Sequence, residues 1–233
     1  MVCTSPPYWG EQRDYMAPGQ LGHEPTVQEY VQNIVIISRE IRRVLRDDGT
    51  YWLNLGDCYQ DKNLSGAPWR VALALQDDGW VLRNELIWSK TNPMPGSASD
   101  RCSIAHEQIF LFSKGKSYFY DHFGEREQSK FKGFSSGTYR QDYTANGAVT
   151  HGVGSKSMHE RNQNGRNLLS VWTFATVPYF GDHFAPWPPK LVRRMISLGT
   201  SAIGCCSVCG IQYRRTFKQD AIFETPFGWE AGC

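Results

Sequence analysis

The tripeptide Asp-Asp-Gly occurs twice in the first part of the chain, each time between a predicted helix and a predicted strand. Asp47-Asp48-Gly49 and Asp77-Asp78-Gly79 each follow an apolar pattern of helical spacing and precede a run of strand-forming residues. Thr26 and Glu29 form a T-x-x-E capping box, and Gly49 is expected at the C-terminal cap of the same helix. The pattern predicts strands at 1–3, 50–55, 81–88, 107–113 and 168–175, and helices at 26–46, 67–76 and 187–198. This alternation predicts an α/β fold whose sheet is covered on both faces.

The composition supports a folded domain and excludes several classes of protein. Of 233 residues, 40% are hydrophobic and 21% charged, which is ordinary for a globular chain. Lys and Arg number 25 against 23 Asp and Glu, so a nucleic-acid surface would have to come from local clustering of charge. No apolar run approaches the roughly 18 residues of a membrane span, and the first ten residues lack the pattern of a signal peptide. We therefore expect a cytoplasmic protein.

The segment Thr4-Ser5-Pro6-Pro7-Tyr8-Trp9 directly follows the first predicted strand. It is therefore expected at the carboxyl end of that strand, where α/β sheets place their ligand sites. An exocyclic amino group on a nucleobase is a poor nucleophile, because its lone pair is delocalised into the ring. Two acceptors, the Ser5 hydroxyl and the Pro6 carbonyl, can bind its two N–H groups and restore nucleophilic character. The prolines fix the acceptors in advance, and Tyr8 offers a face on which a flipped base can stack.

This segment resembles the catalytic motif of DNA amino-methyltransferases, in the Ser form typical of N4-cytosine enzymes. Further blocks resemble the same family in the same order, with the motif order of its permuted classes. They are VLRDDGTYWLNLGDCY (44–59), GWVLRNELIWSKTNPMP (79–95), RCSIAHEQIFLFSK (101–114) and HFAPWPPKLVRRMISLGT (183–200). The resemblance implies a Rossmann-like, S-adenosylmethionine-dependent core at 1–200 that flips a base out of double-stranded DNA. It implies catalytic roles for Ser5, Pro6, Pro7 and Tyr8.

Several alternatives stay open at this point. N6 of adenine is the first, because a single residue, Ser5, favours cytosine. The second is a DNA-binding fragment without catalysis, and the third is methylation of a protein glutamine, against which Ser5 weighs. The resemblance also implies a bacterial, archaeal or phage modification system, with a cognate restriction endonuclease as a candidate partner.

The Gly-rich, polar stretch 121–167 falls where such enzymes place target recognition. Its composition is compatible with that role and equally with a disordered insertion. The basic residues Arg193, Arg194, Arg214, Arg215 and Lys218 are candidates for phosphate contact, although a solvated helix face and hairpin would also explain them.

The cofactor half of the family pattern is only partly present. The apolar residues Phe184, Ala185, Pro186 and Trp187 match a block that flanks the cofactor in the family. The family's Gly-rich loop of the D-P-F-x-G-x-G type is not found after Thr200, and Met1 lies four residues before Ser5. We therefore expect an incomplete core, truncated at both ends, with a partner chain as a candidate source of the cofactor half.

Two further groups of residues carry weaker signals. Cys206 and Cys209 have metal-ligand spacing in the tail 201–233, and Cys233 is a candidate third ligand of a partial zinc ribbon. A structural zinc site needs four ligands, so this chain alone is not expected to complete one. Asn54 and Asp57, at the end of a predicted strand, either approach the substrate or only cap the next turn.

Overall fold

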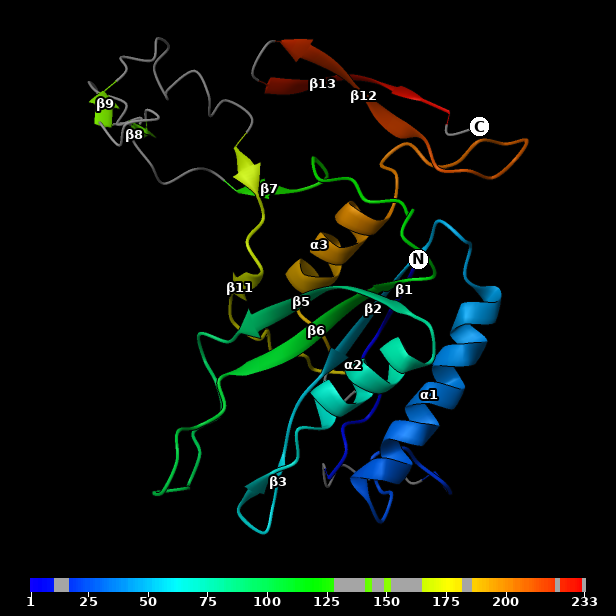
Figure 1. Cartoon of the computed structure of the whole chain (residues 1–233). Helices are drawn as coiled ribbons and strands as arrows, with labels where there is room; N and C mark the ends of the chain where they lie inside the picture. The colour runs from blue at the N-terminus through cyan, green and yellow to red at the C-terminus, as the bar shows by residue number, and fades with distance from the viewer. Residues whose placement is uncertain are drawn as a thin grey trace.

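A five-stranded mixed sheet forms the centre of the protein, a computed structural model of which is shown in Figure 1. The strand order is β1-β2-β6-β5-β11, and only β6 runs antiparallel to its neighbours. The strands are β1 (Val2–Thr4), β2 (Thr50–Leu55), β5 (Val81–Ser89), β6 (His106–Ser113) and β11 (Val171–Thr173). The structure describes residues 1–10, 17–127, 141–143, 149–151, 165–181, 186–220 and 223–231. Every strand of this sheet was expected from the sequence, although β11 is shorter than predicted.

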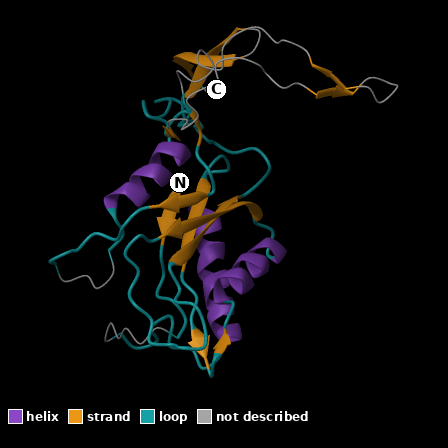
Figure 2. Ribbon diagram, turned by 90° about the vertical axis from the view of Figure 1, so that its left-hand side faces the viewer, coloured by secondary structure: helices purple, strands orange, loops and turns teal. Residues whose placement is uncertain are grey.

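Helices cover both faces of the sheet, as the alternating pattern predicted (Figure 2). The helices α1 (Val27–Val44) and α2 (Ala67–Asp77) contribute to one apolar cluster, in which Tyr51, Leu53 and Phe110 are buried. Helix α3 (Pro189–Gly199) contributes to the other cluster, with Trp52 and Trp172. Successive residues of β2 thus point alternately toward the two hydrophobic cores, which explains why all six are buried.

The glycines of the two Asp-Asp-Gly motifs differ in their position relative to the preceding helix. Thr26 caps the start of α1, accepting a hydrogen bond from the Glu29 backbone N–H at 3.2 Å. The expected C-terminal cap at Gly49 is wrong, because α1 ends at Val44 and Gly49 closes a separate turn. Gly79 does lie at the end of α2, with a φ of +92° that favours glycine.

Within the described residues, four small two-stranded sheets lie outside the central one. They are β3 (Tyr59–Gln60) with β4 (Asn63–Leu64), β7 (Arg126–Glu127) with β10 (Arg166–Asn167), β8 (Gln141–Tyr143) with β9 (Val149–His151), and β12 (Arg214–Asp220) with β13 (Phe223–Glu230). β7 and the β12–β13 hairpin lie at the end of the sheet opposite to the carboxyl ends of β1 and β2 (Figure 1). No helix in the described ranges has both the length and the hydropathy needed to cross a membrane.

Two partly buried ion pairs connect the segment after β6 to α3 and to the hairpin. Arg215 contacts both carboxylate oxygens of Asp121, at 2.8 and 2.9 Å, and Asp121 is almost completely buried. Arg194 of α3 contacts Glu125 at 2.8 Å. These two arginines, which the sequence offered as candidates for phosphate contact, instead hold elements of the protein together.

The position of α3 gives a matched test of the second core. Met195 is completely buried, whereas the adjacent Ile196 is 47% exposed. Met195→Ala is expected to lower the free energy of unfolding by about 2–5 kcal/mol, because it opens a cavity against the sheet. Ile196→Ala should change it by no more than about 0.5 kcal/mol. Urea denaturation of both variants measures the difference, and equal losses would contradict this packing of α3.

Candidate active site at the carboxyl edge of the sheet

The segment that follows β1 leaves the sheet at the carboxyl edge of its parallel strands. β1 pairs in parallel with β2, with Thr4 opposite Leu53, so Ser5 emerges beside the end of β2. The Tyr30 hydroxyl of α1 donates to the Pro7 carbonyl at 3.0 Å, and the Trp9 indole N–H donates to the Glu24 carbonyl at 3.0 Å. The segment is therefore fastened to α1 and to the loop before it, while Ser5 remains exposed.

The Tyr8 hydroxyl lies at the centre of a group of polar side chains from distant parts of the sequence. It lies 3.1 Å from the Ser5 hydroxyl, 2.8 Å from Oε2 of Glu107 and 3.2 Å from Oδ1 of Asn54. Glu107 belongs to β6 and Asn54 to β2, so the sheet itself brings these groups together. Three of these residues, Ser5, Tyr8 and Asn54, were site candidates from the sequence.

Asn54 connects the motif to the segment before α3. Its side chain is completely buried, and its Nδ2 donates to the Gln108 carbonyl at 3.0 Å. Its Oδ1 accepts the indole N–H of Trp187 at 2.8 Å. Asn54 thus positions its neighbours, a role that the sequence analysis did not consider.

Glu107 and Lys90 form an ion pair that the sequence analysis missed. Lys90 Nζ lies 2.5 Å from Glu107 Oε1, and the two side chains are 22% and 13% exposed. Lys90 directly follows β5 and also lies 5.0 Å from the ring centroid of Trp88. A glutamate just before the apolar residues 109–112 of β6 was the signal that could have identified the pair.

Two glycines allow Tyr8 to fit against the sheet. A Cβ on Gly56 would lie 2.5 Å from Cε2 of Tyr8, and a Cβ on Gly22 would lie 2.5 Å from the Tyr8 carbonyl oxygen. Both distances are far below van der Waals contact, so any side chain at either position displaces the tyrosine. The sequence shows a glycine directly after the predicted strand 50–55, but it gives no indication that this glycine contacts Tyr8.

Asp57 has a structural role in the loop that leads to α2. Its Oδ1 accepts hydrogen bonds from the backbone N–H of Cys58 at 2.9 Å and of Gly66 at 3.0 Å, and from the Ser65 hydroxyl at 2.5 Å. The interpretation that Asp57 caps the following turn is therefore the one that the geometry supports.

The structure describes half of the block that the resemblance assigned to the cofactor. Trp187 is half-buried and lies next to the motif through Asn54, and Pro186 precedes it, also half-buried. Phe184 and Ala185 lie outside the described residues. The cofactor role of this block stays a prediction.

The expected zinc ligands are only partly described. Cys206 and Cys209 lie in a turn closed by a hydrogen bond of 2.8 Å from the Gly210 N–H to the Cys206 carbonyl. Cys233 lies outside the described residues, and within the described ranges no three metal-ligating side chains gather. The donor set described here does not fit a structural zinc ion, which needs four ligands.

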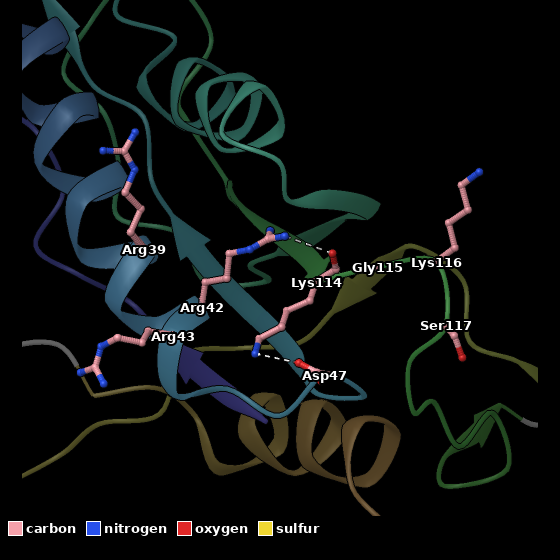
Figure 3. A pocket seen from close by; sticks show the side chains of 8 residues that line it. All are labelled: Arg39, Arg42, Arg43, Asp47, Lys114, Gly115, Lys116 and Ser117. Carbon is pink, nitrogen blue, oxygen red and sulfur yellow. Dashed lines mark hydrogen bonds and ion pairs between the residues drawn. The ribbon is translucent and has the colours of Figure 1, made fainter.

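An open groove at the opposite end of the sheet is lined by basic residues (Figure 3). They are Arg39, Arg42 and Arg43 of α1 together with Lys114 and Lys116. Most of this charge is already compensated, since Arg39 pairs with Asp78, Arg43 with Glu40 and Lys114 with Asp47. Arg42 and Lys116 form no ion pair within the described residues, so the groove keeps these two positive charges. The carboxyl edge, where the side chains of the motif converge, remains the better candidate.

Comparison with known proteins places this arrangement in a family. Residues 1–204 match the family model N6_N4_Mtase, described as DNA methylase. The type II methyltransferase M.XycI of Xanthomonas campestris pv. cyanopsidis is 36% identical over 228 residues, covering 85% of this chain and 65% of that protein. M.SmaI of Serratia marcescens is also 36% identical, covering 85% of this chain and 68% of its own length. The chain thus spans about two thirds of the length of these curated relatives.

The fold agrees with this result. The solved structure of PvuII DNA methyltransferase (cytosine-N4-specific) superposes with a TM-score of 0.55 and 16% identity. The match covers 84% of this chain and 62% of that one, so the predicted Rossmann-like α/β core is confirmed. The chain belongs to the N6_N4_Mtase family of DNA methylases.

The close approach of Gly56 to Tyr8 gives a test of the site's geometry. Gly56→Ala is expected to lower the free energy of unfolding by about 1–3 kcal/mol, because the new methyl group overlaps the Tyr8 ring. In a Tyr8→Ala background the same substitution should cost almost nothing, since the ring is gone. Gly115→Ala is the control, because nothing lies within 4 Å of its Cβ position. Urea denaturation measures all four variants, and an undiminished cost without Tyr8 would contradict the contact.

Proposed function

We propose that this chain carries the catalytic site of a DNA methyltransferase that modifies the exocyclic N4 amino group of cytosine. The observation that supports the proposal is the position of Ser5. It is exposed at the carboxyl edge of the sheet, on a backbone fixed by two prolines and hydrogen-bonded to α1. Because the chain spans about two thirds of its relatives, the activity is inferred from the site's chemistry together with the family.

Ser5 and Pro6 are the acceptors for the two N–H groups of the target amine. The Pro6 carbonyl accepts no hydrogen bond from the described residues, whereas the Pro7 carbonyl already accepts one from Tyr30. Acceptors fixed in this way draw the amine toward tetrahedral geometry, so that its lone pair becomes available for attack. The amine needs no strong base beforehand, because its proton becomes acidic once nitrogen has gained the methyl group, and it then leaves to water.

Tyr8 provides the surface on which the flipped cytosine stacks. Its hydroxyl is fixed by Glu107 and its ring edge by Gly56, so the orientation of the ring is set before DNA binds. The nearby Cys3 does not offer a competing nucleophile, because burial raises the pKa of its thiol to about 12. The site is thus suited to an attack by the substrate's own nitrogen.

S-Adenosylmethionine is the cofactor that we assign to this reaction, and when bound it supplies an electrophilic methyl group. Pro186 and Trp187 would hold it, together with Phe184 and Ala185 of the same block. The aromatic ring of Trp187 fits both a flat adenine and a cationic sulfonium, and its bond to Asn54 keeps it at the edge where Ser5 lies.

The choice of cytosine over adenine rests on Ser5. The fold of PvuII DNA methyltransferase, an enzyme named as cytosine-N4-specific, is similar and supports this choice. N6 of adenine is the alternative. We assign target recognition to 121–167 and a separate, Cys-containing unit to 201–233. β7, near the start of the first segment, lies at the end of the sheet opposite to the carboxyl ends of β1 and β2 (Figure 1). Double-stranded DNA is the proposed partner, with a cognate restriction endonuclease and a chain that completes the cofactor half as further candidates.

The product and the role of Ser5 can be tested together. The purified chain is incubated with plasmid DNA and radiolabelled S-adenosylmethionine, and the digested nucleosides are separated. We expect N4-methylcytosine, and a loss of about 100-fold or more in kcat for Ser5→Ala. Ser117→Ala, an exposed serine in the distal groove, is the control and should leave the rate unchanged. N6-methyladenine without N4-methylcytosine would overturn the cytosine assignment, and an active Ser5→Ala variant would overturn the role of the hydroxyl.

A further inference from the structure

A continuous line of polar contacts runs from the exposed Ser5 hydroxyl to an ion pair inside the site. Ser5 Oγ lies 3.1 Å from the Tyr8 hydroxyl, and that hydroxyl lies 2.8 Å from Glu107 Oε2. The other carboxylate oxygen, Oε1, accepts from Lys90 Nζ at 2.5 Å. The four groups come from the motif, from β6 and from the end of β5.

The inner end of this line fixes the direction of every hydrogen bond in it. The Lys90 ammonium can only donate, and the Glu107 carboxylate can only accept. Asn54, another neighbour of the Tyr8 hydroxyl, also presents an acceptor there. Its Oδ1 receives the indole N–H of Trp187, and its Nδ2 donates to the Gln108 carbonyl. In its contacts with Glu107 and Asn54, the Tyr8 hydroxyl is therefore the donor.

This direction decides what Ser5 presents to a substrate. Since the Tyr8 hydroxyl donates inward, its oxygen is the acceptor in the contact with Ser5, and the Ser5 hydroxyl donates its only proton to it. The Ser5 oxygen then faces solvent with lone pairs alone. In the opposite orientation the hydroxyl would donate to the amine nitrogen and occupy the electron pair that has to attack the methyl carbon.

We propose that Glu107 and Lys90 are positioning residues that hold the Ser5 hydroxyl as an acceptor toward the target amine. The inference rests on the proposed methyl transfer and adds to it a specific role for two residues that do not touch the substrate. The pair acts through Tyr8, which therefore has a second role besides stacking.

Glu107→Gln tests the proposal without a large change in shape. With Oε1 still accepting from Lys90, the amide turns its NH₂ group toward Tyr8 and donates to the phenolic oxygen. That oxygen no longer favours the Ser5 proton, so kcat is expected to fall by about 10- to 100-fold. The KM for DNA should change by less than about threefold, because neither Glu107 nor Lys90 contacts the DNA and ground-state binding is therefore retained. Lys90→Met should act in the same direction, and Lys90→Arg should restore most of the rate. Glu85→Gln on β5 is the matched control and should leave the rate unchanged.

A double-mutant cycle with Tyr8→Phe separates this role from a general structural one. Without the phenolic hydroxyl, the line of contacts is broken before it reaches Ser5, so Glu107→Gln should change kcat by less than about twofold in that background. An equal loss in both backgrounds would overturn the proposal, as would a Glu107→Gln enzyme with wild-type kcat.

A spectroscopic measurement keeps this test distinct from that of the proposed function. In protein labelled with ¹³C at tyrosine Cζ, Glu107→Gln should shift the Tyr8 resonance and Glu85→Gln should not. An unchanged Tyr8 resonance would overturn the inference even if the enzyme is active. If the wild-type chain transfers no methyl group, the proposed function fails and the catalytic role of the pair fails with it, while a shifted resonance would still support the hydrogen bond.

Discussion

The parallel pairing of β1 with β2 is the constraint on which the site depends. β1 has only three residues, and its register places Thr4 beside Leu53, so the next residue, Ser5, follows at the level of Asn54, near the end of β2. The antiparallel strand β6 then brings Glu107 to the same edge. A shift of β1 by one residue would exchange its inward and outward side chains and move Ser5 away from these partners.

The same edge is also where the two cores of the protein meet. Tyr30 of α1, on one face of the sheet, holds the motif by the Pro7 carbonyl. Trp187, which packs with the core around α3 on the other face, reaches Asn54. The motif is thus fastened from both faces, and its exposed Ser5 rests on a buried and rigid base.

The sequence was sufficient for the central fold and for the motif. The periodicity of 26–46 and the strand patterns at 50–55 and 107–113 reflect burial, which a sequence records in its spacing of apolar residues. Ser5 and Tyr8 were identifiable because they flank two prolines, which fix the local backbone, directly after the first predicted strand. The partners of Tyr8 could not be identified in this way. Glu107 lies 99 residues from Tyr8 along the chain, and only the antiparallel insertion of β6 between β2 and β5 brings the two together. The partner of Arg215 could not be predicted either. In the sequence Arg215 is one of several basic residues of the tail, and only the fold brings Asp121, 94 residues away, into contact with it.

The central claim is that the motif works beside a methyl donor held against Trp187. Isothermal titration of the purified chain with S-adenosylmethionine tests it most directly, since it requires neither a recognition sequence nor turnover. The account predicts a Kd in the micromolar range and a Kd at least about tenfold weaker for Trp187→Ala. Absence of binding up to millimolar cofactor, or binding unaffected by the loss of Trp187, would contradict it.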